Sequence, residues 1–403
     1  MVDPDGRPQV TRPNSNEPVF LEDILQPLWI YLRNSGIHHS FLPMNDHHRI
    51  RRIIRYTSTV SIVLLILTFN FFQLTQLIIQ TANRKNIADI SVNVVLTSVS
   101  LMGVLFSYQF YVRHDQLAKF FEDWKQFEIS IPSNCNTGRR EFFSRILVAV
   151  FTLIYVYPIF CFYDNLTHPN KPIFFSYFEI FQEIFGLQFL ALINAVSLLF
   201  IQIFYLLSES IPPLFFYQAS FVIENLGKEL QNICLSLRKQ HLVHLRNENH
   251  YLLIWKKYES IQRLVNRANE LFGITMVFNQ FLFFCCTCIC IYQAVTLSLE
   301  DLLLDPLFFA DIFVSIVRNV VCYRLFSRLY LSWVELKRIV ATLLSEEWYL
   351  LPQNHRDYLT TFLIRVNSEG LAANPLNLYT IDPTSLLRLL GMHVSYIILL
   401  LTS

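Results

Sequence analysis

Glycine is scarce in this sequence, and the shortage excludes several classes of protein. Only 9 of the 403 residues are Gly, so the chain has little material for the glycine-rich loops that cradle phosphate groups. The Walker-type phosphate loop and the His-Glu-x-x-His and Gly-x-Ser-x-Gly patterns are all missing. We therefore expect no enzyme, no cofactor and no bound metal.

Charge is also scarce. Charged residues make up 16% of the chain against 53% hydrophobic ones, and the mean hydropathy is +0.37. A soluble chain of this length carries more charge on its surface. The net charge of +1 gives no reason to expect a nucleic-acid partner. The first 20 residues are rich in Pro and lack an apolar core, so we expect no ordinary cleaved signal peptide.

What the sequence does contain is a series of long apolar runs separated by charged segments. A membrane span needs about 20 apolar residues. Five charge-free windows are long enough or nearly so: 56–83, 90–112, 146–163, 184–208 and 271–299. A sixth apolar run covers 302–323, and a seventh covers about 384–403. The sequence therefore predicts an all-α membrane protein with seven transmembrane helices, in which a 1–55 segment precedes a 56–403 membrane domain.

The distribution of Lys and Arg predicts how these spans are oriented. Of the 32 basic residues, 27 fall on the side of the N-terminus, 3 fall on the other side and 2 lie within spans. Basic residues collect on the cytosolic side of a membrane. We expect a cytosolic N-terminus, an extracellular C-terminus, and long cytosolic helical extensions at about 209–270 and 324–383. The Asn165-Leu166-Thr167 sequon then falls outside, where Asn165 is a candidate glycosylation site.

Two features inside the predicted spans need an interpretation. The run "CCTCIC" at 285–290 places its Cys on two faces of one helix, which favours packing over a metal site. Asp311 lies in the outer half of the sixth span, and ionisable groups in a span are costly and usually face a cavity or a partner. We expect Asp311 to share an outer-half ligand cavity with Tyr157, Gln188 and Tyr292; the alternative is that such groups only hold helices together.

Two shorter patterns predict local structure on the cytosolic side. Apolar residues in "ESIQRLVNRANELF" recur with the 3.6-residue period of one helix face. This stripe consists of Ile261, Leu264, Val265, Ala268, Leu271 and Phe272. The stretch "NPLNLY" at 374–379 differs from the Asn-Pro-x-x-Tyr signature of G-protein-coupled receptors, and we expect a turn there.

The C-terminal stretch "EGLAANPLNLYTIDPTSLLRLLGMHVSYIILLLTS" resembles the C-terminus of insect gustatory receptors. That family carries Thr-Tyr, five apolar residues, Gln and Phe in its last helix; here Ser395 and Tyr396 precede five apolar residues, Thr402 and Ser403. The spacing and the Tyr match, whereas Ser replaces Thr, Thr replaces Gln and Ser replaces Phe, as in a divergent member.

The resemblance implies a function and an assembly. Gustatory receptors are similar to insect odorant receptors, which are ligand-gated cation channels built as tetramers. It implies a homo- or hetero-tetramer in the plasma membrane of chemosensory neurons, in contact with membrane lipid. A small-molecule tastant would open a non-selective pore lined by the last helix of each subunit. The cytosolic extensions would pack into an anchor between the subunits.

The last span has a face that suits a pore. Met392, Ser395, Leu399 and Thr402 follow Arg388 at helical spacing on one side. Hydroxyl groups are inexpensive there if they meet water, and a ring of Leu can close a pore by dewetting. The alternative is a lipid-facing helix whose hydroxyls bond back to their own carbonyls.

Two other functions stay open at this stage. A G-protein-coupled-type metabotropic receptor is one, although its natural orientation would place the 27 basic residues outside. A secondary transporter is the other; it would explain Asp311 and Arg318 within one span, but no internal repeat is visible.

Overall fold

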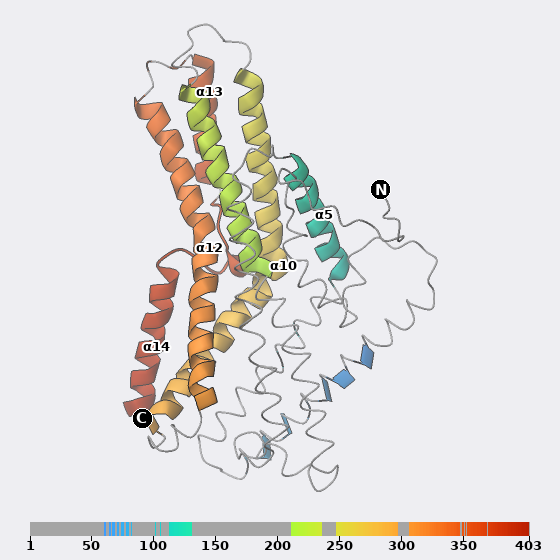
Figure 1. Cartoon of the computed structure of the whole chain (residues 1–403), viewed down its shortest axis with the longest axis vertical. Coiled ribbons are helices and arrows are strands. Elements are labelled where there is room, and N and C mark those ends of the chain that lie inside the picture. Colours follow the sequence, from blue (N-terminus) through green and yellow to red (C-terminus); the bar gives the residue numbers. More distant parts are fainter. Residues whose placement is uncertain are drawn as a thin grey trace, which may run out of the picture.

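The chain is described by a computed structural model over residues 113–130, 211–235, 247–296, 306–346, 353–368 and 370–402, and at single positions between 60 and 105 and at 349 and 351 (Figure 1). All described residues lie in helices, turns or loops, and no strand occurs among them. This confirms the all-α class for the described part of the chain.

Two helices are far longer than a membrane is thick. α10 (Asn247–Thr296) has 50 residues and α12 (Pro306–Glu346) has 41. At 1.5 Å per residue they extend for about 75 Å and about 60 Å. α10 runs without a break from a charged segment into the predicted fifth span, and α12 runs from within the predicted sixth span into the charged segment that follows it.

The other described helices are shorter. They are α5 (His114–Ser130), a helix over 211–235, α13 (Gln353–Ser368), the 3-10 turn η2 (Pro375–Asn377) and α14 (Ser385–Thr402). The η2 turn confirms the turn expected at 374–379. By hydropathy, the part of the chain described here holds no helix with a stretch long and apolar enough to cross a membrane. The seven spans and their orientation stay predictions.

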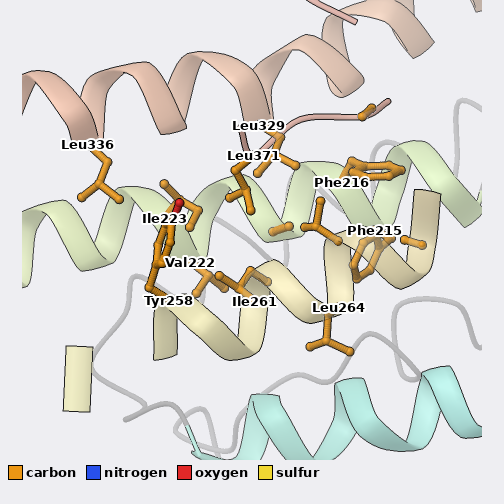
Figure 2. Packing of buried hydrophobic residues seen from close by; sticks show 14 of the residues in the cluster. Phe215, Phe216, Val222, Ile223, Tyr258, Ile261, Leu264, Leu329, Leu336 and Leu371 are labelled. Carbon is orange, nitrogen blue, oxygen red and sulfur yellow. The ribbon is translucent and has the colours of Figure 1, made fainter. Parts of the chain in front are cut away.

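The hydrophobic core lies where α10, α12 and the helix over 211–235 run side by side (Figure 1). All six residues of the predicted stripe in α10 are buried, as the sequence pattern indicated. Figure 2 shows Ile261 of this stripe next to Val222, whereas Leu264 points toward α5. Leu371, which lies after α13, is fully buried in the same cluster.

Aromatic rings connect four helices within this core. Phe215 lies with its ring centroid 4.9 Å from that of Phe120 and 4.7 Å from that of Trp124, both in α5. Its neighbour Phe216 lies 5.6 Å from Phe326 in α12. Edge-to-face pairs at these distances add to the area that the rings bury.

Ion pairs tie the same helices together at the edge of the core. Lys257 of α10 places Nζ 3.0 Å from both carboxylate oxygens of Glu229. Glu224 is 2.7 Å from Arg328 of α12 and accepts a hydrogen bond of 3.0 Å from the Ser332 hydroxyl. The helix over 211–235 is thus bound to both long helices by polar contacts as well as by packing.

A strap, defined here as residues 370–384, connects α13 to α14. α13 lies beside one end of α12, whereas α14 lies beside the other end, against α10 and α12 (Figure 1). The strap therefore returns the chain to the middle of the long helices, where α14 begins.

Candidate functional site

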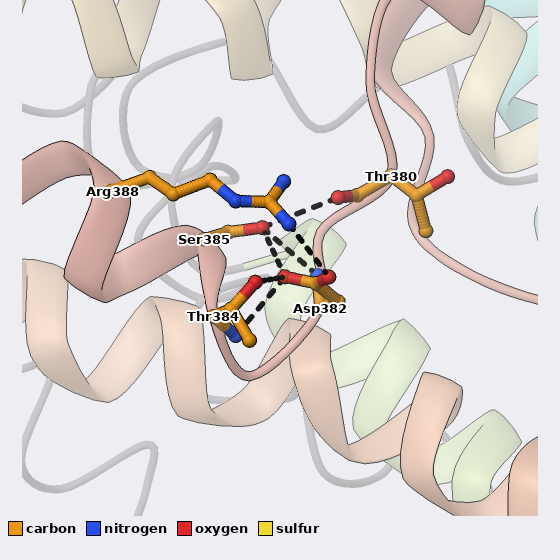
Figure 3. Close-up of polar contacts among 5 residues, drawn as sticks. All are labelled: Thr380, Asp382, Thr384, Ser385 and Arg388. Carbon is orange, nitrogen blue, oxygen red and sulfur yellow. Dashed lines mark hydrogen bonds and ion pairs between the residues drawn. The ribbon is translucent and has the colours of Figure 1, made fainter.

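The start of α14 is fixed by a cap at Asp382. Its carboxylate oxygen Oδ1 accepts hydrogen bonds from the Thr384 N–H at 3.0 Å, the Thr384 hydroxyl at 2.8 Å and the Ser385 hydroxyl at 2.8 Å (Figure 3). In return, the Asp382 N–H donates to Ser385 Oγ over 3.0 Å. This reciprocal pair is a capping box, with Ser385 at the third position after the cap residue Asp382. Pro383 occupies the first position after the cap residue, where proline is common. This cap fixes the residue at which α14, the helix predicted to line a pore, begins.

The charge of Asp382 has a partner of its own. Its second oxygen, Oδ2, lies 3.6 Å from Nη2 of Arg388, which is in the first turn of α14. Burial alone would raise the pKa of Asp382. The hydrogen bonds from Ser385 and Thr384 together with the Arg388 charge outweigh this effect and lower the pKa below its usual value. Asp382 is therefore an anion at neutral pH.

The strap is held against α10 by one buried side chain. Asn269 Nδ2 donates to the carbonyl of Ala372 at 3.0 Å, and Asn269 Oδ1 accepts from the N–H of Asn374 at 2.8 Å. One turn on, Gly273 lets the strap approach closely: a Cβ on this glycine would lie 2.8 Å from the backbone N of Leu376. Both contacts fix the chain just before α14.

The strap leaves a cavity of about 510 Å³ between itself, α10 and α12. No charged side chain lines it; the lining residues are Asn266, Asn269, Tyr330, Trp333, Gly370, Ala372, Asn374, Asn377 and Thr380. The strap thus packs on the core through Leu371, Ala373 and Ile381 and still leaves this cavity beside it.

One face of α14 packs against the rest of the chain. Leu386 and Leu389 pack on the core cluster, and His393 is only 4% exposed. The His393 ring lies with its centroid 5.4 Å from that of Phe283 and 4.8 Å from that of Phe284, both in α10. Its Nδ1 is 2.7 Å from the Leu389 carbonyl and its Nε2 is buried without a partner among the described residues.

The face predicted to line a pore is exposed. Arg388, Met392, Ser395 and Leu399 are all exposed, Leu399 at 61%. The Ser395 hydroxyl donates to the Gly391 carbonyl at 2.9 Å, as hydroxyls in apolar helices often do. Thr402 ends α14, and its side chain lies outside the described residues.

A second exposed face of α14 is wholly apolar. It consists of Leu387, Leu390, Val394 and Ile398. By helical projection it lies roughly a third of a turn around the helix from the face of Met392 and Ser395. The helix thus has three faces: one packed on its own chain, one apolar and exposed, and one exposed that mixes polar with apolar groups.

The remaining predicted residues are placed only in part. Tyr396 is half exposed, and its ring centroid is 5.6 Å from that of Phe284. Tyr292 lies in α10 and Asp311 in α12, with side chains outside the described residues. Tyr157, Gln188 and Asn165 lie outside the described residues altogether, so the ligand cavity stays a prediction.

Sequence reasoning missed three residues at this site. The pattern Asp-Pro-Thr-Ser was a readable signal for the Asp382 cap. For Asn269 and His393 no local signal exists, because each meets partners more than 100 residues away in the chain.

Comparisons with known proteins bear on the fold. No protein-family model matches the chain, and no curated protein sequence does either. Solved structures do match, two of which are described here. The insect olfactory receptor OR5 from Machilis hrabei matches with a TM-score of 0.70 at 15% identity, over 94% of this chain and 98% of that one. The same receptor in complex with eugenol matches with a TM-score of 0.72 at 15% identity, over 95% and 98%. This chain therefore has the fold of an insect olfactory receptor, as the resemblance of its C-terminus predicted.

Proposed function

We propose that this protein is a chemosensory receptor that acts as a ligand-gated, non-selective cation channel. The observation that carries the proposal is α14: its Met392, Ser395 and Leu399 face is exposed on the single chain, while another face packs on α10 and α12. The shared fold with an olfactory receptor over nearly the whole chain supports it. Four copies, identical or mixed with related subunits, would place this face around one axis in the plasma membrane.

Within such a pore each residue has a role. Leu399 forms an apolar ring that closes the path by dewetting, and Ser395 and Thr402 offer uncharged oxygens to passing cations. Hydroxyl rings cannot replace a hydration shell as a carbonyl filter does. Selectivity among monovalent cations is therefore weak.

The ligand is a small-molecule tastant bound in the outer half of the helix bundle. Tyr157, Gln188, Tyr292 and Asp311 form its pocket, in which a polar ligand or water satisfies the carboxylate. OR5 has been solved with the small molecule eugenol, which supports small-molecule binding by this fold. Asn165 carries a glycan on the extracellular side.

The test is ligand-evoked current in excised membrane patches without nucleotides. A panel of sugars, bitter compounds and eugenol is applied to patches from cells that express this chain alone or with related subunits. A channel gives current with no added cofactor. Current that requires guanine nucleotides would identify a metabotropic receptor, and ligand uptake coupled to an ion gradient would identify a transporter.

A further inference from the structure

Arg388 is the one basic side chain on the exposed mixed face of α14. It belongs to the face of Met392, Ser395 and Leu399 by helical spacing, and its side chain is 70% exposed. It lies in the first turn of the helix, next to the strap. A positive charge in that position faces the same space as Met392, Ser395 and Leu399.

The Asp382 carboxylate is positioned to pair with the Arg388 charge. Its side chain is only 20% exposed, and all three hydrogen bonds from Thr384 and Ser385 go to Oδ1. Oδ2 is thereby turned toward Arg388, as Figure 3 shows. The pair is unequal: the cation is exposed, whereas the anion is fixed and half-buried behind it.

We propose that Arg388 sets the charge selectivity and conductance of the channel at the α14 N-terminal mouth, and that Asp382 limits its repulsion of cations. This rests on the proposed function, because it requires α14 to line the pore. Four guanidinium groups near an axis repel cations and attract anions. The positive end of each helix adds to this field, and the Asp382 carboxylate opposes both.

The two charges act in opposite directions, which makes the inference testable. Arg388→Gln removes the exposed cation and keeps a long polar side chain, so cation conductance rises. Asp382→Asn keeps a hydrogen-bond acceptor for the cap but removes the charge that offsets Arg388, so cation conductance falls and anion permeability rises. In the double variant, which carries both changes, the conductance rises from the Asp382→Asn value toward the Arg388→Gln value.

The experiment is single-channel recording of the purified protein in planar lipid bilayers with NaCl on both sides. Conductance is read from individual openings, and the ratio of chloride to sodium permeability is read from reversal potentials in a NaCl gradient. Arg388→Gln is expected to raise sodium conductance roughly twofold or more at low salt. The difference shrinks at high salt, because mobile ions screen the charges.

Arg338→Gln is the matched control. Arg338 of α12 is 67% exposed and pairs with Glu335 at 2.5 Å, so the change removes an equally exposed, carboxylate-paired cation away from α14. It is expected to leave conductance unchanged. If Asp382→Asn does not fold, Arg388→Gln alone carries the test, since it leaves the cap intact.

The outcomes separate this inference from the function on which it rests. Absence of openings in every form of the protein, with the same panel of sugars, bitter compounds and eugenol applied, would contradict the channel itself. Openings whose conductance changes in Leu399→Ser but stays the same, with the same permeability ratio, in Arg388→Gln would overturn the role of Arg388 alone.

Discussion

The side-chain carbonyl of Asn269 in α10 accepts a hydrogen bond of 2.8 Å from the backbone N–H of Asn374 in the strap. The other end of the same amide donates to Ala372 at 3.0 Å. One buried side chain thus satisfies two backbone groups from a segment more than 100 residues away in sequence. Since the strap leads directly into α14, this contact connects the long helix to the candidate pore.

Asn269→Ala should therefore destabilise the protein. It leaves a backbone donor and a backbone acceptor without partners, at a cost of about 2 kcal/mol. Thermal unfolding of the purified protein in detergent measures this as a lower midpoint. Asn266→Ala is the matched control, because Asn266 lies one turn earlier in α10 and is exposed. Equal midpoints for both variants would show that the contact contributes nothing.

Gly273→Ala tests the close approach of the strap. The added Cβ would lie 2.8 Å from the backbone N of Leu376, so the strap has to move, at a cost of about 1–3 kcal/mol. Gly370→Ala, in the strap itself, places its Cβ at an ordinary 3.8 Å from Trp333 and should not destabilise. The same unfolding assay compares the two. A Gly273→Ala protein as stable as the original would mean that the strap does not lie against α10.

The Asp382 cap predicts a dependence of stability on pH. The pKa of this carboxyl is lowered in the folded protein by its hydrogen bonds and by Arg388 against the opposing effect of burial. Its stabilisation is therefore fully present above the unfolded pKa of about 3.9, and is lost as the pH falls through the lower folded value.

Asp382→Ala should cost about 1 kcal/mol at neutral pH, the usual contribution of a helix cap. The difference in the free energy of unfolding between this variant and the original protein should stay constant from about pH 8 to about pH 5, because the carboxyl is ionised over this range. The difference should shrink below about pH 4. Unfolding midpoints measured across this range check it. A difference that changes around pH 6 to 7 would point to a histidine instead.

Local patterns in the sequence predicted part of this structure well. The stripe from Ile261 to Phe272 is buried as its spacing indicated, because the helical period alone determines which side chains share a face. The exposed face of Met392, Ser395 and Leu399 follows from the same rule. The role of Asp382 as a helix cap could also have been predicted, from the pattern Asp-Pro-Thr-Ser.

Contacts between distant segments could not be predicted. Nothing near Asn269 in the sequence reveals that Ala372 and Asn374 are its partners, since these are set by how the strap folds back. The burial of His393 between Phe283 and Phe284 depends on the pairing of α10 with α14 in the same way. The predicted pocket draws on four spans, so it requires still more such pairings.

Leu399 is predicted to be the closing ring of the pore. Leu399→Ser lowers the dewetting barrier and should raise ligand-independent current severalfold. The control is Ile398→Ser, a neighbouring exposed residue at the same depth that projects from the apolar face. Whole-cell current, normalised to surface expression, compares the variants. A rise in Ile398→Ser alone would assign the pore to the other face of α14.

Cysteine accessibility shows whether the mixed face of α14 lines the ion path. Ser395→Cys and Val394→Cys are neighbours on two different exposed faces of the helix. Each is treated with a positively charged methanethiosulfonate while current flows, with the unsubstituted channel and its 8 native Cys as the baseline. Current through Ser395→Cys is expected to fall as each thiol is modified, whereas current through Val394→Cys is expected to stay at the baseline. Block of Val394→Cys with no effect on Ser395→Cys would contradict this expectation.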